Sequence, residues 1–104
     1  MAQVERPDAA LCVIILRYVV PIEEIDRHMA DHVAWLTRGY AEGVFLASGR
    51  QVPRTGGVIL TRGHKREVEA LVATDPFVAS GAAVADVIEF TASMAASGFT
   101  ALLA

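Results

Sequence analysis

Two histidines, His28 and His32, lie four positions apart in the segment HMADHVAWL, with Asp31 directly before the second. On a helix, this spacing puts both imidazoles on one side, where they could share a metal ion. The protease form of such a pair has glutamate directly after the first histidine, and a catalytic zinc has three protein ligands. Here Met29 holds the glutamate position, and only His64 remains as a further histidine. We therefore expect no metal and interpret His28 as helix surface.

His32 remains a candidate for acid/base chemistry, because histidine titrates near neutrality and is the commonest general acid or base. A catalytic imidazole needs a partner that fixes its tautomer. Asp31 is a poor choice, since it points nearly opposite the apolar side of the helix and is most simply a solvated carboxylate. The strongest partner elsewhere is Asp75, which precedes Pro76 where a helix ends. The alternative is that Asp75 only caps local backbone in a turn.

Two residues of the first apolar segment, Arg17 and Cys12, have side chains that can take part in chemistry. Arg17 interrupts this segment, and a charge there needs either a structural salt bridge or a bound substrate anion. Cys12, the single cysteine, lies in the apolar run LCVIIL and is expected to be a buried structural thiol. No nucleophile elbow, phosphate-binding glycine loop or dinucleotide fingerprint is present in the sequence, which disfavours phosphoryl and hydride transfer.

Hydrophobic periodicity predicts the elements that must position these residues. An apolar, β-branched run predicts a strand covered on both faces, and spacings of three or four residues predict two amphipathic helices. The predicted order is strand 10–19, a helix from Ile22 that stops at Gly43, a hairpin of strands 44–52 and 58–61, helix 65–75 and strand 84–91. The segment DPFVASGAA is expected to be a turn-rich connector, and the tail TASMAASGFTALLA, which follows the last strand, is expected to pack on a partner.

The long helix decides where His32 points. Its apolar stripe is centred near four residues, namely Met29, Val33, Leu36 and Tyr40. His32 lies on the flank of this stripe and can face a cleft at the helix edge. Trp35 is further round on the same side, where it can form a wall of that cleft or contact a partner.

The element order predicts an α+β fold, a ferredoxin-like β-α-β-β-α-β sandwich that forms one domain over residues 1–104. Such a sheet has helices on one face only, whereas the first strand is apolar at consecutive positions. Two sheets packed face to face in a homodimer, or in a higher oligomer, would cover the second face. A composition of 54% hydrophobic residues in so small a chain favours this arrangement.

Charge and targeting signals exclude several other classes of partner. The formal net charge is −3 and the basic residues are scattered, which disfavours nucleic acid. No segment has the length or composition of a signal peptide or a membrane span. We expect a cytoplasmic protein that binds neither nucleic acid nor membranes.

With these residues described, the chain resembles the YciI-like (YCII-related) family of small bacterial proteins along almost its whole length. The matching segments are LCVIILRYVVP, DHVAWL followed by GYAEGVFLASG, QVPRTGGVIL, and DPFVASGAA leading to VIEF. The resemblance implies a dimeric α+β barrel with a pocket in each subunit. It also implies a catalytic pair at the helix histidine and the D-P aspartate, here His32 and Asp75. Ser48, Gly49 and Phe77 also lie in matched segments and join Arg17 and Trp35 as candidate substrate-binding residues.

Two positions depart from the family pattern. Many relatives have proline where this chain has Arg50, and arginine where it has Met29. Arg50 would add a cation at the rim of the pocket and Met29 would remove one. One branch of the family is linked to dehydrochlorination of a chlorinated hydroxyquinol, and related barrels include muconolactone isomerases and small monooxygenases.

We therefore expect an enzyme without a cofactor that uses His32 and Asp75 for elimination, isomerisation or hydrolysis of a small cyclic or aromatic metabolite. Asp75 would hold the imidazole and favour its protonated form, while His32 takes the proton. One alternative is a dimer that binds a small ligand without catalysis, because a satisfied His–Asp pair can be structural. Another is a structural dimer with a filled cleft.

Overall fold

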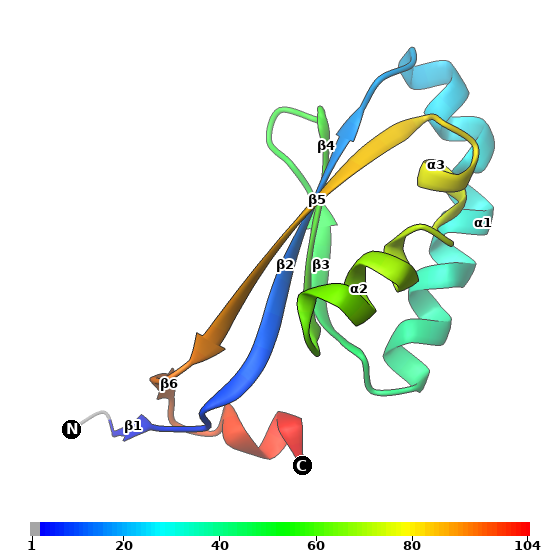
Figure 1. Cartoon of the computed structure of the whole chain (residues 1–104). Coiled ribbons are helices and arrows are strands. Elements are labelled where there is room, and N and C mark those ends of the chain that lie inside the picture. The colour runs from blue at the N-terminus through cyan, green and yellow to red at the C-terminus, as the bar shows by residue number, and fades with distance from the viewer. Residues whose placement is uncertain (1–2) are drawn as a thin grey trace.

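The computed structural model describes residues 3–104, in which one four-stranded antiparallel sheet carries its helices on a single face (Figure 1). The strands are β2 (Ala9–Tyr18), β3 (Phe45–Arg50), β4 (Gly56–Arg62) and β5 (Ala83–Ala92), in the order β3-β4-β2-β5. The helices are α1 (Ile22–Ala41), α2 (Lys65–Val72) and α3 (Pro76–Ala79). This strand order is the ferredoxin-like one, which confirms the predicted α+β fold.

The core lies between the sheet and the helices. β2 is a central strand that pairs with β4 on one side and with β5 on the other. Its alternate residues Cys12, Ile14 and Leu16 are fully buried beneath the helices, as the two-residue period of a strand requires. The Cys12 thiol is buried as expected, and this desolvation raises its pKa.

The second face of the sheet is open in the described residues, so β2 is not covered on both faces within one subunit. Val13 and Ile15 point to this face and are half-buried. On the adjacent strand, Ile88 is 53% exposed and Phe90 is 40% exposed. Leu11, on the same face of β2, is buried, so the open part of this apolar face begins at Val13. The apolar sequence of β2 therefore reflects one covered face and one face that a single chain covers only in part.

The close approach of α1 to the sheet depends on Gly39. A Cβ atom at this position would lie 2.1 Å from ring atoms of Phe45, which is buried at the start of β3. Gly43, with a φ of 73°, supplies the left-handed conformation that turns the chain from α1 into β3. Glycine thus sets both the distance and the direction between these two elements.

Several short elements were not predicted from the sequence. The expected connector contains α3, and the chain ends add β1 (Val4–Glu5), β6 (Ala95–Ala96) and a 3-10 helix, η1 (Thr100–Leu103). β1 pairs with β6, and the Glu5 carboxylate accepts hydrogen bonds from the backbone N–H groups of Gly98 and Thr100, both at 2.7 Å. In Figure 1 these pieces lie together beyond one end of the sheet. No helix within residues 3–104 is long and apolar enough to cross a membrane.

Candidate functional site

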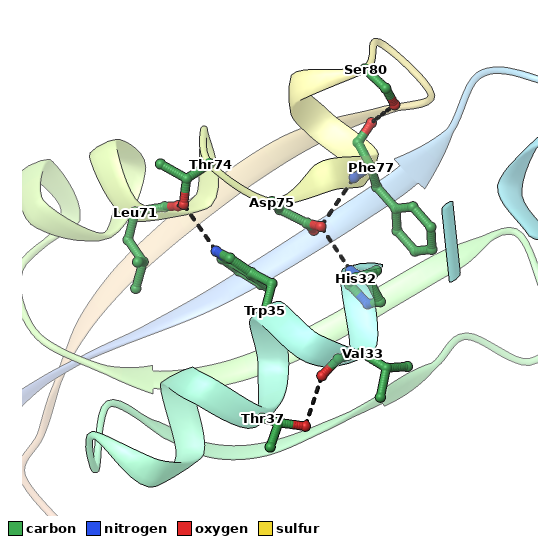
Figure 2. Close-up of polar contacts among 9 residues, drawn as sticks. All are labelled: His32, Val33, Trp35, Thr37, Leu71, Thr74, Asp75, Phe77 and Ser80. Carbon is green, nitrogen blue, oxygen red and sulfur yellow. Dashed lines mark hydrogen bonds and ion pairs between the residues drawn. The ribbon is translucent and has the colours of Figure 1, made fainter. Parts of the chain in front are cut away.

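His32 and Asp75 meet although they are 43 residues apart in the chain. His32 projects from the middle of α1, and Asp75 stands directly before α3 (Figure 2). The distance from His32 Nδ1 to Asp75 Oδ1 is 2.8 Å, and both side chains are buried. α1 and α3 therefore pack so that the one buried histidine of the described chain faces its one buried carboxylate.

Asp75 is held by the local sequence. It is the N-cap of α3, and its Oδ1 atom also accepts a hydrogen bond from the Phe77 backbone N–H at 3.1 Å. Pro76 occupies the first helical position, where a missing N–H costs nothing. Asp75 thus caps local backbone and also binds His32, so the two interpretations of this residue are compatible.

The contact fixes which nitrogen of His32 can act. A carboxylate only accepts, so Nδ1 is the donor to Asp75 and the neutral ring keeps its lone pair on Nε2. No hydrogen bond joins Nε2 to another residue within 3–104. The ring of Phe77 stacks on the imidazole with centroids 4.0 Å apart and planes 13° apart, which restricts the tilt of the ring. His32 is therefore oriented at one nitrogen and free at the other.

Asp75 has an incomplete set of partners. Its side chain is fully buried, and Oδ2 has no hydrogen-bond partner among the residues that the structure describes. A buried carboxylate is costly unless it is compensated. The contacts of Oδ1 with His32 and with the Phe77 N–H are what compensate it, so the interaction with His32 is central to keeping this charge inside the protein.

A pocket of about 290 Å³ opens beside His32, between α1 and the β3–β4 end of the sheet. Most of its wall is apolar, and Phe77 lies next to His32 on one side. The apolar residues are Leu16, Met29, Val33, Leu36, Val58, Ile59 and Phe77. A pocket of this size and polarity suits a small organic molecule of about one ring.

The expected apolar stripe of α1 is divided between the core and this pocket. Met29, Val33 and Leu36 line the pocket, and Val33 is 49% exposed. The buried face of α1 is instead Ile25, His32, Trp35 and Gly39. The buried face is thus rotated from the predicted stripe towards His32 and Trp35, although Met29 and Leu36 still pack against the core. The periodicity did not show this rotation, because an apolar pocket wall and a core-facing surface have the same period. His32 stands at their boundary, which lets a buried residue reach a cavity.

Three of the candidate substrate-binding residues line the pocket, namely Ser48, Gly49 and Phe77. Ser48 and Gly49 are on β3, opposite the wall formed by α1. The Ser48 hydroxyl lies 2.6 Å from the Tyr40 hydroxyl, so these two groups form a hydrogen bond between α1 and β3. Met29 and Arg50, the two positions that depart from the family pattern, also line the pocket.

Trp35 does not line this pocket. It is buried, and its indole N–H donates to the Thr74 hydroxyl at 2.9 Å (Figure 2). Thr74 in turn donates to the Leu71 carbonyl at the end of α2. Trp35 is one helical turn from His32 and holds the residue directly before Asp75, so it positions the pair from a distance.

Arg17 also lies outside the pocket. Its neighbours Leu16 and Tyr18 line the pocket, and the alternation of a strand puts Arg17 on the opposite face of the sheet, where it is exposed. No ion pair in the described part of the chain includes it. It remains a solvated charge at the edge of the open face in a single subunit.

Asp31 and the two other histidines, His28 and His64, lie apart from the site. Asp31 is exposed, as expected, and His28 is half-buried outside the pocket lining. His64 is exposed and contacts Glu89. Within residues 3–104, no three histidine, cysteine, aspartate or glutamate side chains gather in a way that could hold a metal ion.

Sequence reasoning missed Arg54, Asp26 and Tyr18. Arg54 and Tyr18 line the pocket, and Arg54 donates to the Asp26 carboxylate on α1 at 2.7 Å. This hydrogen bond raises the pKa of the Arg54 guanidinium. Tyr18 could have been found, because it continues the alternation of Leu16 along β2. Arg54 is in a loop, where no periodicity indicates direction.

Comparison with known proteins identifies a family for this chain and a solved structure of similar fold. A family model described as the YCII-related domain matches residues 5–91, which include His32 and Asp75. Comparison with curated proteins gave no match.

A similar solved structure is 5-chloro-2-hydroxyhydroquinone dehydrochlorinase from Burkholderia phenoliruptrix, in complex with 2,5-dihydroxybenzoquinone. The two chains are 19% identical, and the match covers 78% of this chain and 93% of that chain with a TM-score of 0.66. At this identity, the likeness shows a shared fold.

Proposed function

Because this chain belongs to the family of YCII-related domains, we propose that it is a cytoplasmic small-molecule enzyme in which His32 carries out acid/base chemistry on a single-ring substrate. The observation that carries the proposal is the 2.8 Å contact between His32 Nδ1 and Asp75 Oδ1 at the wall of an apolar pocket.

Each residue of the site has a distinct part in this chemistry. Nε2 of His32 takes a proton from the substrate and returns it to the leaving group or to another atom of the product. Asp75 holds the ring in the required tautomer, and it favours the imidazolium that forms. Phe77 stacks on the imidazole and contributes an apolar wall, so its packing holds the proton-transferring ring in place.

Elimination is the leading reaction class. The dehydrochlorinase of similar fold acts, by its name, on a hydroxylated single ring that loses hydrogen chloride. A base beside an apolar pocket suits the same kind of step, since it removes a proton while chloride departs with the bonding electrons. The volume of about 290 Å³ also fits one substituted ring.

The proposal is tested with a panel of chlorinated and unchlorinated hydroxyhydroquinones, by following chloride release and product masses. His32→Asn is the informative variant, because the asparagine side-chain NH₂ can take the place of Nδ1 and still donate to Asp75, whereas Nε2 is lost. His28→Asn is the matched control, since His28 is on the same helix and does not line the pocket. We expect turnover by wild type and His28→Asn only. Equal turnover by His32→Asn would reject the assignment.

A second candidate, a dimer that binds a small ligand without catalysis, is favoured by one observation. The His32–Asp75 contact joins α1 to α3 and satisfies a buried carboxylate, so it has structural value without any reaction. The same panel separates the two functions. Saturable binding with no product from any compound would support the binding module.

A further inference from the structure

Two arginines, Arg50 and Arg54, line the same pocket as His32, and only one of them is neutralised. Arg54 is paired with Asp26 at 2.7 Å. Arg50 also lines the pocket, and none of the ion pairs within residues 3–104 includes it. No aspartate or glutamate is among the described lining residues. The pocket therefore has an unbalanced positive charge at Arg50.

The strand geometry explains why Arg50 reaches the pocket. In the β3–β4 register, Ser48 is opposite Ile59 and Arg50 is opposite Gly57, and all four residues line the pocket. Ser48 and Arg50 are two positions apart, so they share the helix-facing side of β3. Gly57 has no side chain, which leaves room beside Arg50 on that face. Ser48 and Arg50 thus present a hydroxyl and a guanidinium along one wall.

The rest of the pocket limits what the guanidinium can bind. Its walls are mostly apolar, and its volume of about 290 Å³ holds roughly one ring. Guanidinium groups bind carboxylates through parallel N–H donors, and Arg50 is exposed, so its guanidinium is accessible to a ligand. Arg54, already bound to Asp26, contributes a fixed wall and is less available for a ligand.

We infer that this pocket selects a single-ring carboxylate, with Arg50 binding the carboxylate group and the ring lying against Phe77 and the apolar wall towards His32. The inference rests on the proposed function only in using the same pocket. It adds the substrate class and assigns specificity to a residue that has no part in the proton transfer.

Benzoate and benzamide are suitable probes, because they have nearly the same shape and differ in charge. Their affinities are measured by ligand-observed NMR titration on the wild-type protein and on Arg50→Gln. We expect wild type to prefer benzoate over benzamide. In Arg50→Gln, benzoate affinity falls about 10- to 100-fold, as for loss of one charge-assisted contact, while benzamide affinity changes less than about twofold.

Arg66→Gln is the matched control. It makes the same change in net charge at an exposed position on α2 that does not line the pocket. A similar loss of benzoate affinity in this variant would show a general charge effect and overturn the inference. So would equal wild-type affinities for the two probes, or no binding of either at millimolar concentration.

The outcomes also separate this inference from the proposed function. His32→Asn removes Nε2 and leaves Arg50 in place, so it keeps the preference for benzoate even though turnover is lost. A protein that prefers benzoate and converts no compound would refute the proposed enzyme and support the anion site. A protein that turns over ring substrates but binds benzoate and benzamide equally would support the proposed enzyme and refute the anion site.

Discussion

The buried carboxylate of Asp75 is bound through one oxygen only, and that oxygen contacts the side chain proposed to move protons. Such an arrangement combines two functions, since the charge that orients His32 also depends on His32 for its own compensation. Changes at either residue are therefore expected to affect both stability and turnover. The loss of turnover and the loss of unfolding free energy are measured separately, so the two effects can be distinguished.

At this scale, Asp75→Asn tests the orienting role. Both contacts of Asp75 are made by Oδ1, so an asparagine oxygen in that place keeps the two hydrogen bonds but carries no negative charge. In the other orientation, its NH₂ group donates to Nδ1, holds the wrong tautomer of His32 and loses the contact with the Phe77 N–H. We expect turnover to fall by at least about 10²-fold. The free energy of unfolding should fall by about 1–3 kcal/mol, measured by urea denaturation.

Asp31→Asn is the control for this variant, because it makes the same substitution next to His32 at an exposed position. Asp31→Asn should change neither the turnover nor the free energy of unfolding. Wild-type turnover in Asp75→Asn would show that the carboxylate has no part in orienting the imidazole.

The sequence predicted individual site residues where the chemistry requires particular residue types. His32 and Asp75 were candidates because a general base needs a partner, and Phe77 followed from the same motif. Arg17 was a candidate because a charge interrupts an apolar strand, and Trp35 because the helix wheel puts it on the same side as His32. Their actual positions depend on which face of β2 is covered and how α1 rotates, and neither is encoded locally.

At the scale of elements, the packing of α1 on β3 sets the width of the pocket. Gly39→Ala would put a Cβ atom 2.1 Å from ring atoms of the buried Phe45. Although alanine favours a helix by up to about 1 kcal/mol over glycine, the clash forces the elements apart. We expect a net loss of about 1–3 kcal/mol in the free energy of unfolding, and weaker binding of pocket ligands.

Gly49→Ala is the control for stability, since an added Cβ there meets no atom within 4 Å. Urea denaturation of both variants checks this prediction. An unchanged midpoint for Gly39→Ala would mean that α1 and β3 are not in the close contact described.

The attachment of the chain ends is expected to depend on pH. Hydrogen bonds from the Gly98 and Thr100 N–H groups lower the pKa of the Glu5 carboxyl. Because its pKa is lower in the folded protein, the carboxylate stabilises this attachment above its unfolded pKa of about 4.3, and the contribution is lost as pH falls through the folded pKa. The amide resonances of Gly98 and Thr100 should therefore shift together in acid.

Glu5→Gln removes the titrating group and should abolish that shift. Amide resonances that still move in this variant would trace the titration to another group. The comparison uses NMR spectra over the same pH range for both proteins.

The order and type of the main elements could be predicted from the sequence, because β2, α1 and β5 have long hydrophobic patterns. α3 could not, since four residues are too few to show a period. β1, β6 and η1 depend on contacts between the two chain ends, such as those of Glu5, and local sequence does not show these contacts.

For the whole molecule, we propose that the open face of the sheet is the interface of a homodimer. Val13, Ile15, Ile88 and Phe90 form an apolar surface on this face, and exposed patches of this kind mark interaction sites. Ile88→Lys would put a charge in the interface. We expect wild type to sediment as a dimer and this variant as a folded monomer.

Val52→Lys is the control, because Val52 is 96% exposed in the loop between β3 and β4 and lies outside the sheet. It should leave the sedimentation coefficient unchanged. A wild-type protein that sediments as a monomer at micromolar concentration would contradict the proposed interface.

Proton exchange between Nε2 of His32 and a molecule in the pocket can be measured without knowing the natural substrate. The experiment follows the replacement of an acidic C–H hydrogen of a bound hydroxylated ring compound by deuterium, using ¹H NMR in D₂O. Base-catalysed elimination or isomerisation at a ring carbon removes such a proton. We expect catalysed exchange by wild type and His28→Asn and none by His32→Asn. Exchange at the wild-type rate in His32→Asn would show that another group moves the proton.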